Sequence, residues 1–236
     1  MADWIKELFK LLLEAGWELA KEYSPEIMKA IRGWWSNKTL AIIGPTACGK
    51  DSLLARLQGK PVPKQHINTG APEEVKAYEI NYSLDGGEEV SFKANKTLNV
   101  GGEENDREDY WADVCKGADV IFYMVDAQRL RDEHNSFMRR IQQDMRWLAA
   151  EGLNNPNAKL IIVLNKFDLL LDGKEPENLE DAFLNLGAPL ATEVQNIAIK
   201  ELKAKAECLK GVMPLSTTDG YLFSQLFPPI LRAATK

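Results

Sequence analysis

A glycine-rich segment between residues 44 and 52 contains the residue types that bind phosphate. An apolar run at 39–43 precedes it, and a stretch of helical character at 53–57 follows it. In such a loop the backbone N–H groups and the start of the helix attract phosphate, and glycine permits approaches that a Cβ would block. This order of strand, loop and helix predicts a nucleotide site, in which Lys50 reaches the β- and γ-phosphates. The predicted binding residues of the loop are Gly44, Thr46, Ala47, Cys48, Gly49, Lys50, Asp51 and Ser52.

Asp51 departs from the motif of this loop, and Cys48 has two interpretations. Asp51 stands where the motif has a serine or threonine whose hydroxyl binds Mg²⁺, and Ser52 comes one position later. The electrostatics of the helix end would lower the pKa of the Cys48 thiol; alternatively, Cys48 is only a residue small enough to fit.

A second polar cluster follows the apolar run at 159–164. It reads Asn165-Lys166-Phe167-Asp168 and begins about 115 residues after Lys50. The Asp168 carboxylate would accept hydrogen bonds from the N1–H and the exocyclic amino group of guanine. Adenine offers no such pair of donors, so a buried carboxylate would be left unpaired. The cluster therefore predicts a guanine site, with Lys166 lying along the base and bracing the phosphate loop.

These two motifs, in this order, resemble those of the Ras-like small GTPase superfamily, and within it the Arf-like group and the signal-recognition-particle receptor beta subunit. Asn99-Val100-Gly101-Gly102-Glu103 resembles the Asp-Val-Gly-Gly-Gln of the Arf-like switch II, and Arg107 and Trp111 resemble the arginine and tryptophan that follow it. The run 118–126 resembles the central strand of the family, and Ser216-Thr217 resembles its base-contacting loop. The resemblance covers residues 38–236. It implies GTP or GDP and Mg²⁺ as ligands, and it adds Ser216 and Thr217 to the nucleotide site.

The resemblance also implies catalytic and metal-binding residues, and several of them depart from the family pattern. The implied catalytic residues are Lys50, Gly102 and Glu103, and the implied metal ligands are Asp51, Asn99 and Thr69. Thr69 fits a plain loop threonine equally well, because the thirty positions from it to Asn99 exceed the usual gap of the family. Asn99 replaces an aspartate and Glu103 replaces a glutamine that positions water with both a donor and an acceptor. An ionised glutamate only accepts, which predicts slow hydrolysis of GTP. Two interpretations stay open. Either the site has decayed and binds nucleotide weakly or without Mg²⁺, or Asp51 and Asn99 have exchanged roles, because the site has lost a carboxylate at position 99 and gained one at position 51.

The apolar runs and turns predict an α/β domain with a doubly wound, mostly parallel six-stranded sheet. Asp85-Gly86-Gly87 makes the second and third strands a hairpin, which gives one antiparallel edge. Ligands of such sheets bind at the carboxyl ends of the strands. The expected strands are near 39–43, 74–83, 88–98, 119–126, 159–165 and 210–215. The expected helices include 128–152, 178–186 and 189–206.

Residues 1–37 form an added segment on which the resemblance is silent. Charged and apolar residues occupy opposite arcs of a helix, and Ser24-Pro25-Glu26 starts a second one, so the segment predicts an amphipathic helical hairpin. Four of the six tryptophans lie here: Trp4, Trp17, Trp34 and Trp35. Three roles stay open: packing on the chain's own domain, docking or oligomerisation, and binding at a membrane surface. The charge balance over 1–36, five basic against six acidic residues, argues against the last.

Composition excludes several other classes. The chain has 236 residues, 45% of them hydrophobic, and a net charge of -6, so nothing favours binding of nucleic acid. Three cysteines suit free thiols in the cytoplasm, with Cys115 and Cys208 structural. The expected function is a GTP/GDP-dependent switch that acts on a protein partner through its switch regions or its N-terminal helices. A non-switching GTP-binding scaffold is the alternative, and a P-loop phosphotransferase is a weaker one, because the guanine motif and Ser216-Thr217 argue against it.

Overall fold

The computed structural model describes residues 38–63, 73–83, 89–99, 110–172 and 179–235, and for 73–83 and 89–99 it describes the backbone only. The predicted hairpin at 1–37 lies outside these ranges. No helix within them is long and apolar enough to cross a lipid bilayer.

The described strands form one six-stranded sheet in the order β2-β3-β1-β4-β5-β6. All neighbouring pairs are parallel except β2 and β3, which are antiparallel. The sheet confirms the predicted doubly wound fold with one antiparallel edge. Its strands are β1 (Thr39–Ile43), β2 (Glu73–Ser83), β3 (Glu89–Asn99), β4 (Val120–Asp126), β5 (Lys159–Asn165) and β6 (Leu209–Pro214).

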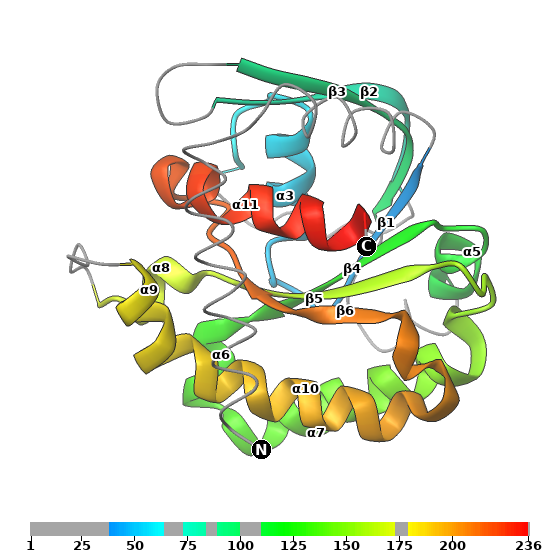
Figure 1. Cartoon of the computed structure of the whole chain (residues 1–236), viewed down its shortest axis with the longest axis vertical. Coiled ribbons are helices and arrows are strands. Elements are labelled where there is room, and N and C mark those ends of the chain that lie inside the picture. Colours follow the sequence, from blue (N-terminus) through cyan, green and yellow to red (C-terminus); the bar gives the residue numbers. More distant parts are fainter. Residues whose placement is uncertain (1–37, 64–72, 84–88, 100–109, 173–178, 236) are drawn as a thin grey trace.

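Helices cover both faces of this sheet, and Figure 1 shows α3 and α11 on one face and α7 and α10 on the other. The main helices are α3 (Lys50–Leu57), α6 (Ala127–Asp132), α7 (His134–Trp147), α10 (Ala188–Leu202) and α11 (Gly220–Thr235). Shorter helical elements are α5 (Ala112–Cys115), α8 (Phe167–Leu170) and α9 (Leu179–Ala182), the π-helical turns η2 (Leu148–Gly152) and η3 (Phe183–Gly187), and the 3-10 helix η4 (Lys203–Cys208). Because both faces are covered, every residue of β4 is buried, as is usual for parallel sheets.

The predicted single helix over 128–152 is wrong, because the chain forms two helices there. Asp126 caps α6 by accepting from the Arg129 N–H at 3.0 Å. At Glu133 the backbone leaves the helical region (φ -112°, ψ 34°), and α7 begins at the next residue. The apolar periodicity of α7 is as expected, since Phe137 and Ile141 are buried.

The register of the strands brings the predicted motifs to one edge. Asp126 at the end of β4 lies beside Asn165 at the end of β5. Ile42 lies beside Asn99 at the end of β3, and the phosphate loop begins directly after β1. The carboxyl ends of five strands therefore carry the candidate site, as expected for an open α/β sheet.

Candidate nucleotide site

The phosphate loop has the backbone conformations that its glycines predict. Gly44 (φ 137°) and Gly49 (φ 89°) both have positive φ. A Cβ on Gly44 would lie 2.3 Å from the carbonyl oxygen of Met124 in β4. Ala47 also has a positive φ, 63°. The loop therefore curls tightly over the end of β4, and only glycine can occupy its first position.

Lys50 lies across the mouth of this loop. Its Nζ donates to the carbonyl oxygens of Gly44 and Pro45, each at 3.0 Å, and only 6% of the residue is exposed. Burial of a charge is costly unless nearby groups compensate it. A phosphate group inside the loop fits this arrangement, since Lys50 and the start of α3 both favour a negative charge there.

Asn165 connects three segments of the site. Its Nδ2 donates to the Cys48 carbonyl oxygen at 2.8 Å and to Thr217 Oγ1 at 3.2 Å. Its Oδ1 accepts from the Thr217 backbone N–H at 3.1 Å. A Cβ on Gly49 would lie 2.2 Å from the same Nδ2. Asn165 thus holds the phosphate loop and the 216–217 loop in register, and Gly49 leaves the space that its amide fills.

Asp168 is held by hydroxyl groups from the loop after β6. Ser216 Oγ donates to one carboxylate oxygen at 2.6 Å, and Thr218 Oγ1 donates to the other at 3.3 Å. Within the described ranges Asp168 forms no ion pair with a basic side chain. A carboxylate oxygen can accept more than one hydrogen bond, so Asp168 keeps acceptors for a base with two adjacent N–H donors. Guanine has this pair of donors.

Lys166 lies differently from the prediction that it braces the phosphate loop. Its Nζ pairs with Asp126 Oδ2 at 2.6 Å, and its backbone is left-handed, with φ 62°. The brace on the loop comes from Asn165 instead, together with Arg129, whose Nη1 donates to the Thr46 carbonyl oxygen at 3.4 Å.

Sequence reasoning missed three residues of this site. Asp126 ends a buried strand next to β5, so the rule that ligands lie at carboxyl ends would have found it. Arg129 and Arg56 have no such signal in the sequence. Arg56 donates to the carbonyl oxygens of Thr217 and Thr218, at 2.9 and 3.0 Å, and so fixes the base-side loop from α3.

The interpretation of Cys48 as an activated thiol is wrong. The residue is fully buried, and burial raises the pKa of its thiol to about 11. Lys50 acts in the opposite direction but has the smaller effect. Cys48 is therefore a small apolar residue of the loop. Cys115 and Cys208 are also buried, as expected for structural cysteines.

The predicted metal ligands are described only in part. Asp51 lies in the first turn of α3, half-buried, and Ser52 follows it. The backbone of Asn99 lies at the end of β3, beside Ile42, and its side chain is outside the description. Thr69, Gly102 and Glu103 lie wholly outside the described residues. A carboxylate at Asp51 suits Mg²⁺, which prefers oxygen ligands.

Comparison with known proteins agrees with this geometry. The ADP-ribosylation factor family matches residues 25–210. The chain belongs to this family. The family and the site together make the protein a GTP-binding small GTPase, and the family's match begins within the segment predicted as an extension.

Two individual proteins are similar to this chain, one in sequence and one in structure. It is 29% identical over 149 residues to GTPase Der of a Nitratiruptor species, and this match covers 60% of the chain. The chain spans only 27% of the length of that relative. A solved structure, the signal recognition particle receptor SRb-GTP/SRX complex from Chaetomium thermophilum, matches with a TM-score of 0.56 at 12% identity. The match covers 82% of this chain and 97% of the other, and it supports the shared fold.

Proposed function

We propose that this GTPase is a switch whose GTP- and GDP-bound states differ in affinity for a protein partner. The observation that carries the proposal is the Asn165 junction, where one amide joins the phosphate loop to the base-side loop. Asp168, held by Ser216 and Thr218, supplies the guanine contact. A nucleotide bound across this junction would contact both loops at once, so loss of the γ-phosphate changes one end of a connected structure.

The metal site is proposed to contain a reversed pair. Asp51 would bind Mg²⁺ directly, and the Asn99 amide would donate to Asp51, so that the formal charge of the site is that of the usual arrangement. Asp51 follows Lys50 on the first turn of α3, and Asn99 ends the neighbouring strand. The variant Asp51→Asn tests this proposal. Its GTP affinity should fall, and much of its dependence on Mg²⁺ should disappear; unchanged affinity and unchanged metal dependence would contradict it.

Hydrolysis of GTP is proposed to be slow without a partner. Glu103, at the position of the water-positioning glutamine, offers only acceptors when it is ionised, beside an anionic triphosphate. Lys50 and the backbone at Gly102 would contact the γ-phosphate. A single-turnover assay checks this, with Glu103→Gln as the comparison. The variant should hydrolyse GTP faster than the natural chain, and an equal or lower rate would refute the role given to Glu103.

A non-switching scaffold is the second candidate, because the residue types at Asp51, Asn99 and Glu103 all depart from the switch pattern. In that case GTP is a structural ligand that does not exchange. The proposed setting for either role is the cytoplasm, with residues 1–37 packing on the domain, binding a partner or second copy, or contacting a membrane surface.

Nucleotide analysis of the purified chain distinguishes the two candidates. Bound GTP that resists exchange over hours would indicate the scaffold. Exchangeable GDP, with protease sensitivity around 60–110 that depends on the nucleotide, would indicate the switch. The same measurements on a chain that lacks residues 1–37 show whether the N-terminal segment alters exchange. Transfer of phosphate from GTP to a small-molecule acceptor would contradict both.

A further inference from the structure

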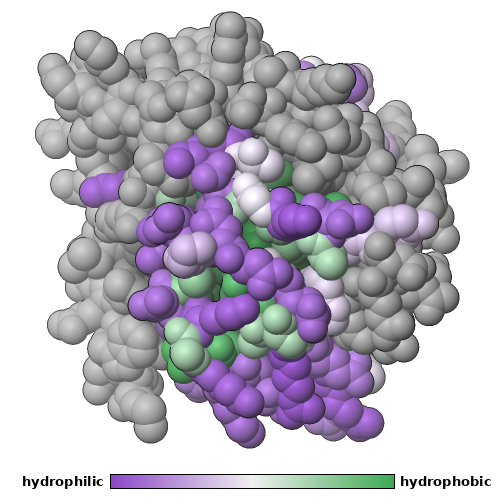
Figure 2. Space-filling model, turned by 90° about the vertical axis from the view of Figure 1, so that its right-hand side faces the viewer, coloured by the Kyte–Doolittle hydropathy of each residue, from purple (hydrophilic) through white to green (hydrophobic). Residues whose placement is uncertain are grey.

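A pocket lies at the edge of the molecule where β4, β5 and β6 begin, opposite the nucleotide site. Figure 2 views this side of the molecule, where hydrophilic side chains surround small apolar areas. The pocket has a volume of about 500 Å³ and lies between the ends of α7 and α10. It is lined by Arg146, Ala149, Ala150, Glu201, Leu202, Lys203, Ala204 and Lys205.

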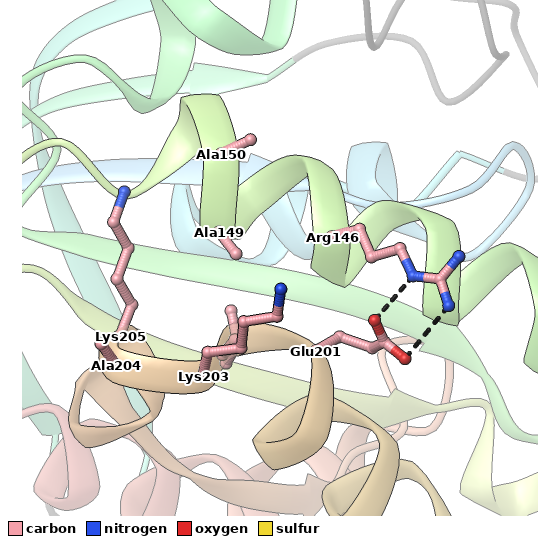
Figure 3. Close-up of a pocket in the computed structure, with 8 residues that line it drawn as sticks. Arg146, Ala149, Ala150, Glu201, Lys203, Ala204 and Lys205 are labelled. Carbon is pink, nitrogen blue, oxygen red and sulfur yellow. Dashed lines mark hydrogen bonds and ion pairs between the residues drawn. The ribbon is translucent and has the colours of Figure 1, made fainter.

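Small apolar side chains line this pocket, and cationic side chains stand at its rim. Three alanines and a leucine supply the apolar lining, and Arg146, Lys203 and Lys205 supply positive charge. In Figure 3 the side chains of Lys203 and Lys205 extend toward the helix end that carries Ala149 and Ala150. Within the described ranges neither lysine forms an ion pair, so their two ammonium groups are available to an anion.

The one carboxylate of the rim is already engaged. Glu201 accepts from Arg146 Nε at 2.6 Å and from Gln142 Nε2 at 2.7 Å, and Figure 3 shows its contact with Arg146. These hydrogen bonds lower the pKa of Glu201 to about 2, so it stays ionised and paired with Arg146 at neutral pH. The unmatched charge of the rim is therefore that of Lys203 and Lys205.

The backbone at Lys203 is strained. Its φ of 53° and ψ of -120° form a conformation that favours glycine, yet a lysine occupies the position. Strained conformations persist where the surroundings enforce them, and they cluster at binding and catalytic sites. Glycine would remove the strain together with the ammonium group, which at the C-terminal end of α10 also interacts favourably with the helix dipole.

Charge complementarity indicates the ligand. The whole chain has a net charge of -6, so the unmatched lysines of this pocket favour an acidic partner against the overall charge of the molecule. Lys38, Lys159 and Lys210 lie near the starts of β1, β5 and β6, and the pKa of Lys159 is lowered by burial, then by Lys210 and Lys38. Lys38 is paired with Asp119 at 3.6 Å, so Lys159 and Lys210 are the lysines that extend positive charge along the edge beyond the pocket. A concave pocket with apolar lining suits a single inserted side chain better than a flat lipid surface.

We propose that this pocket docks an acidic segment of a protein partner, with one apolar side chain against its alanines and flanking carboxylates on Lys203 and Lys205. The site is separate from the nucleotide site, so the proposal does not depend on the switch. It gives the chain a second surface for a partner, at the edge remote from the phosphate loop.

The test is binding of a fluorescein-labelled peptide with a central leucine flanked by three glutamates on each side, followed by fluorescence anisotropy. The natural full-length chain, loaded with GDP, should bind this peptide and not the same peptide with glutamines for glutamates. Lys203→Gly should weaken binding by about threefold and Lys203→Gly with Lys205→Gln by about tenfold, the range expected for exposed charge pairs. Lys200→Gln, an equal loss of charge on α10 outside the pocket, should change binding by less than about 1.5-fold.

The Lys203→Gly variant also serves as a control for correct folding. Lys203→Gly relieves the strained backbone, so its melting temperature should equal or exceed that of the natural chain, and its GDP affinity should be unchanged. Absence of peptide binding would overturn the proposal, as would equal binding by the lysine variants. Binding to phosphatidylserine vesicles that requires Lys203 and Lys205, without binding of the peptide, would overturn it in favour of a lipid surface.

Discussion

Substitution of Gly49 by alanine tests whether the Asn165 junction stabilises the domain as the structure indicates. The new Cβ would lie 2.2 Å from Asn165 Nδ2 and 3.4 Å from Thr217 Oγ1, on a residue with φ 89°. The left-handed backbone costs a non-glycine residue about 1–2 kcal/mol. Asn165 must also move, and it makes three hydrogen bonds in this buried place.

The expected loss of stability follows from these contacts. Three buried hydrogen bonds at about 0.5–1.5 kcal/mol each add about 1.5–4.5 kcal/mol to the backbone term. We therefore expect Gly49→Ala to lower the free energy of unfolding by about 2.5–6.5 kcal/mol, a large part of the total for a domain. Gly59→Ala is the matched control. Gly59 also has a positive φ, 65°, but a Cβ there meets nothing within 4 Å, so only the backbone cost of about 1–2 kcal/mol applies.

Urea unfolding of the nucleotide-free variants, followed by tryptophan fluorescence, measures the difference. Gly49→Ala should be less stable than Gly59→Ala by at least about 1.5 kcal/mol, the lower bound for three lost hydrogen bonds. If the two variants unfold at the same urea concentration with the same slope, the Asn165 junction contributes nothing measurable and the reasoning is refuted.

Three further predictions concern charge and burial. Arg146 and Gln142 lower the pKa of the Glu201 carboxylate from 4.5 to about 2, so this carboxylate binds its proton more readily in the unfolded chain. The stability that it contributes should therefore be lost as the pH falls from about 4.5 to about 2. Urea unfolding should show that the difference in stability between the natural chain and Glu201→Gln shrinks over that range and stays constant above it. The Cys48 thiol, with a pKa of about 11, should resist iodoacetamide at pH 8 in the native chain and react after denaturation; mass spectrometry that finds native alkylation would contradict its burial. Asp126→Asn removes the charge partner of Lys166 and should lower the free energy of unfolding by about 1–3 kcal/mol. This loss is smaller than for a fully buried ion pair because the lysine is partly exposed. An unchanged midpoint of urea unfolding would refute this prediction.

The sequence predicts those parts of the molecule whose cause is local. The phosphate loop is one example, since Gly44, Gly49 and Lys50 act through the backbone of a single turn. The strands are another, because burial on both faces requires continuous apolar runs such as 159–165. The hairpin follows from three turn residues between two strands.

Features that depend on tertiary contact were not predictable in this way. The break at Glu133 interrupts a helical periodicity that continues on both sides of it. Asn165 and Cys48 are 117 residues apart, so no local pattern connects them, and the anchoring of Thr217 and Thr218 by Arg56 appears only after folding. The Cys48 thiol shows the same limit, because its pKa depends on the core packed around it rather than on its place in a motif.

The relative affinities for GDP, ADP and xanthosine diphosphate, measured by calorimetry for the natural chain and Asp168→Asn, test the guanine site most directly. An asparagine offers one donor and one acceptor, which complements the N1–H and C2 carbonyl of xanthine rather than the two donors of guanine. The natural chain should prefer GDP to both others, with ADP weaker by about 10⁴-fold, and Asp168→Asn should prefer xanthosine diphosphate to GDP. Equal affinity of the natural chain for ADP and GDP, or an unchanged preference in Asp168→Asn, would contradict the account.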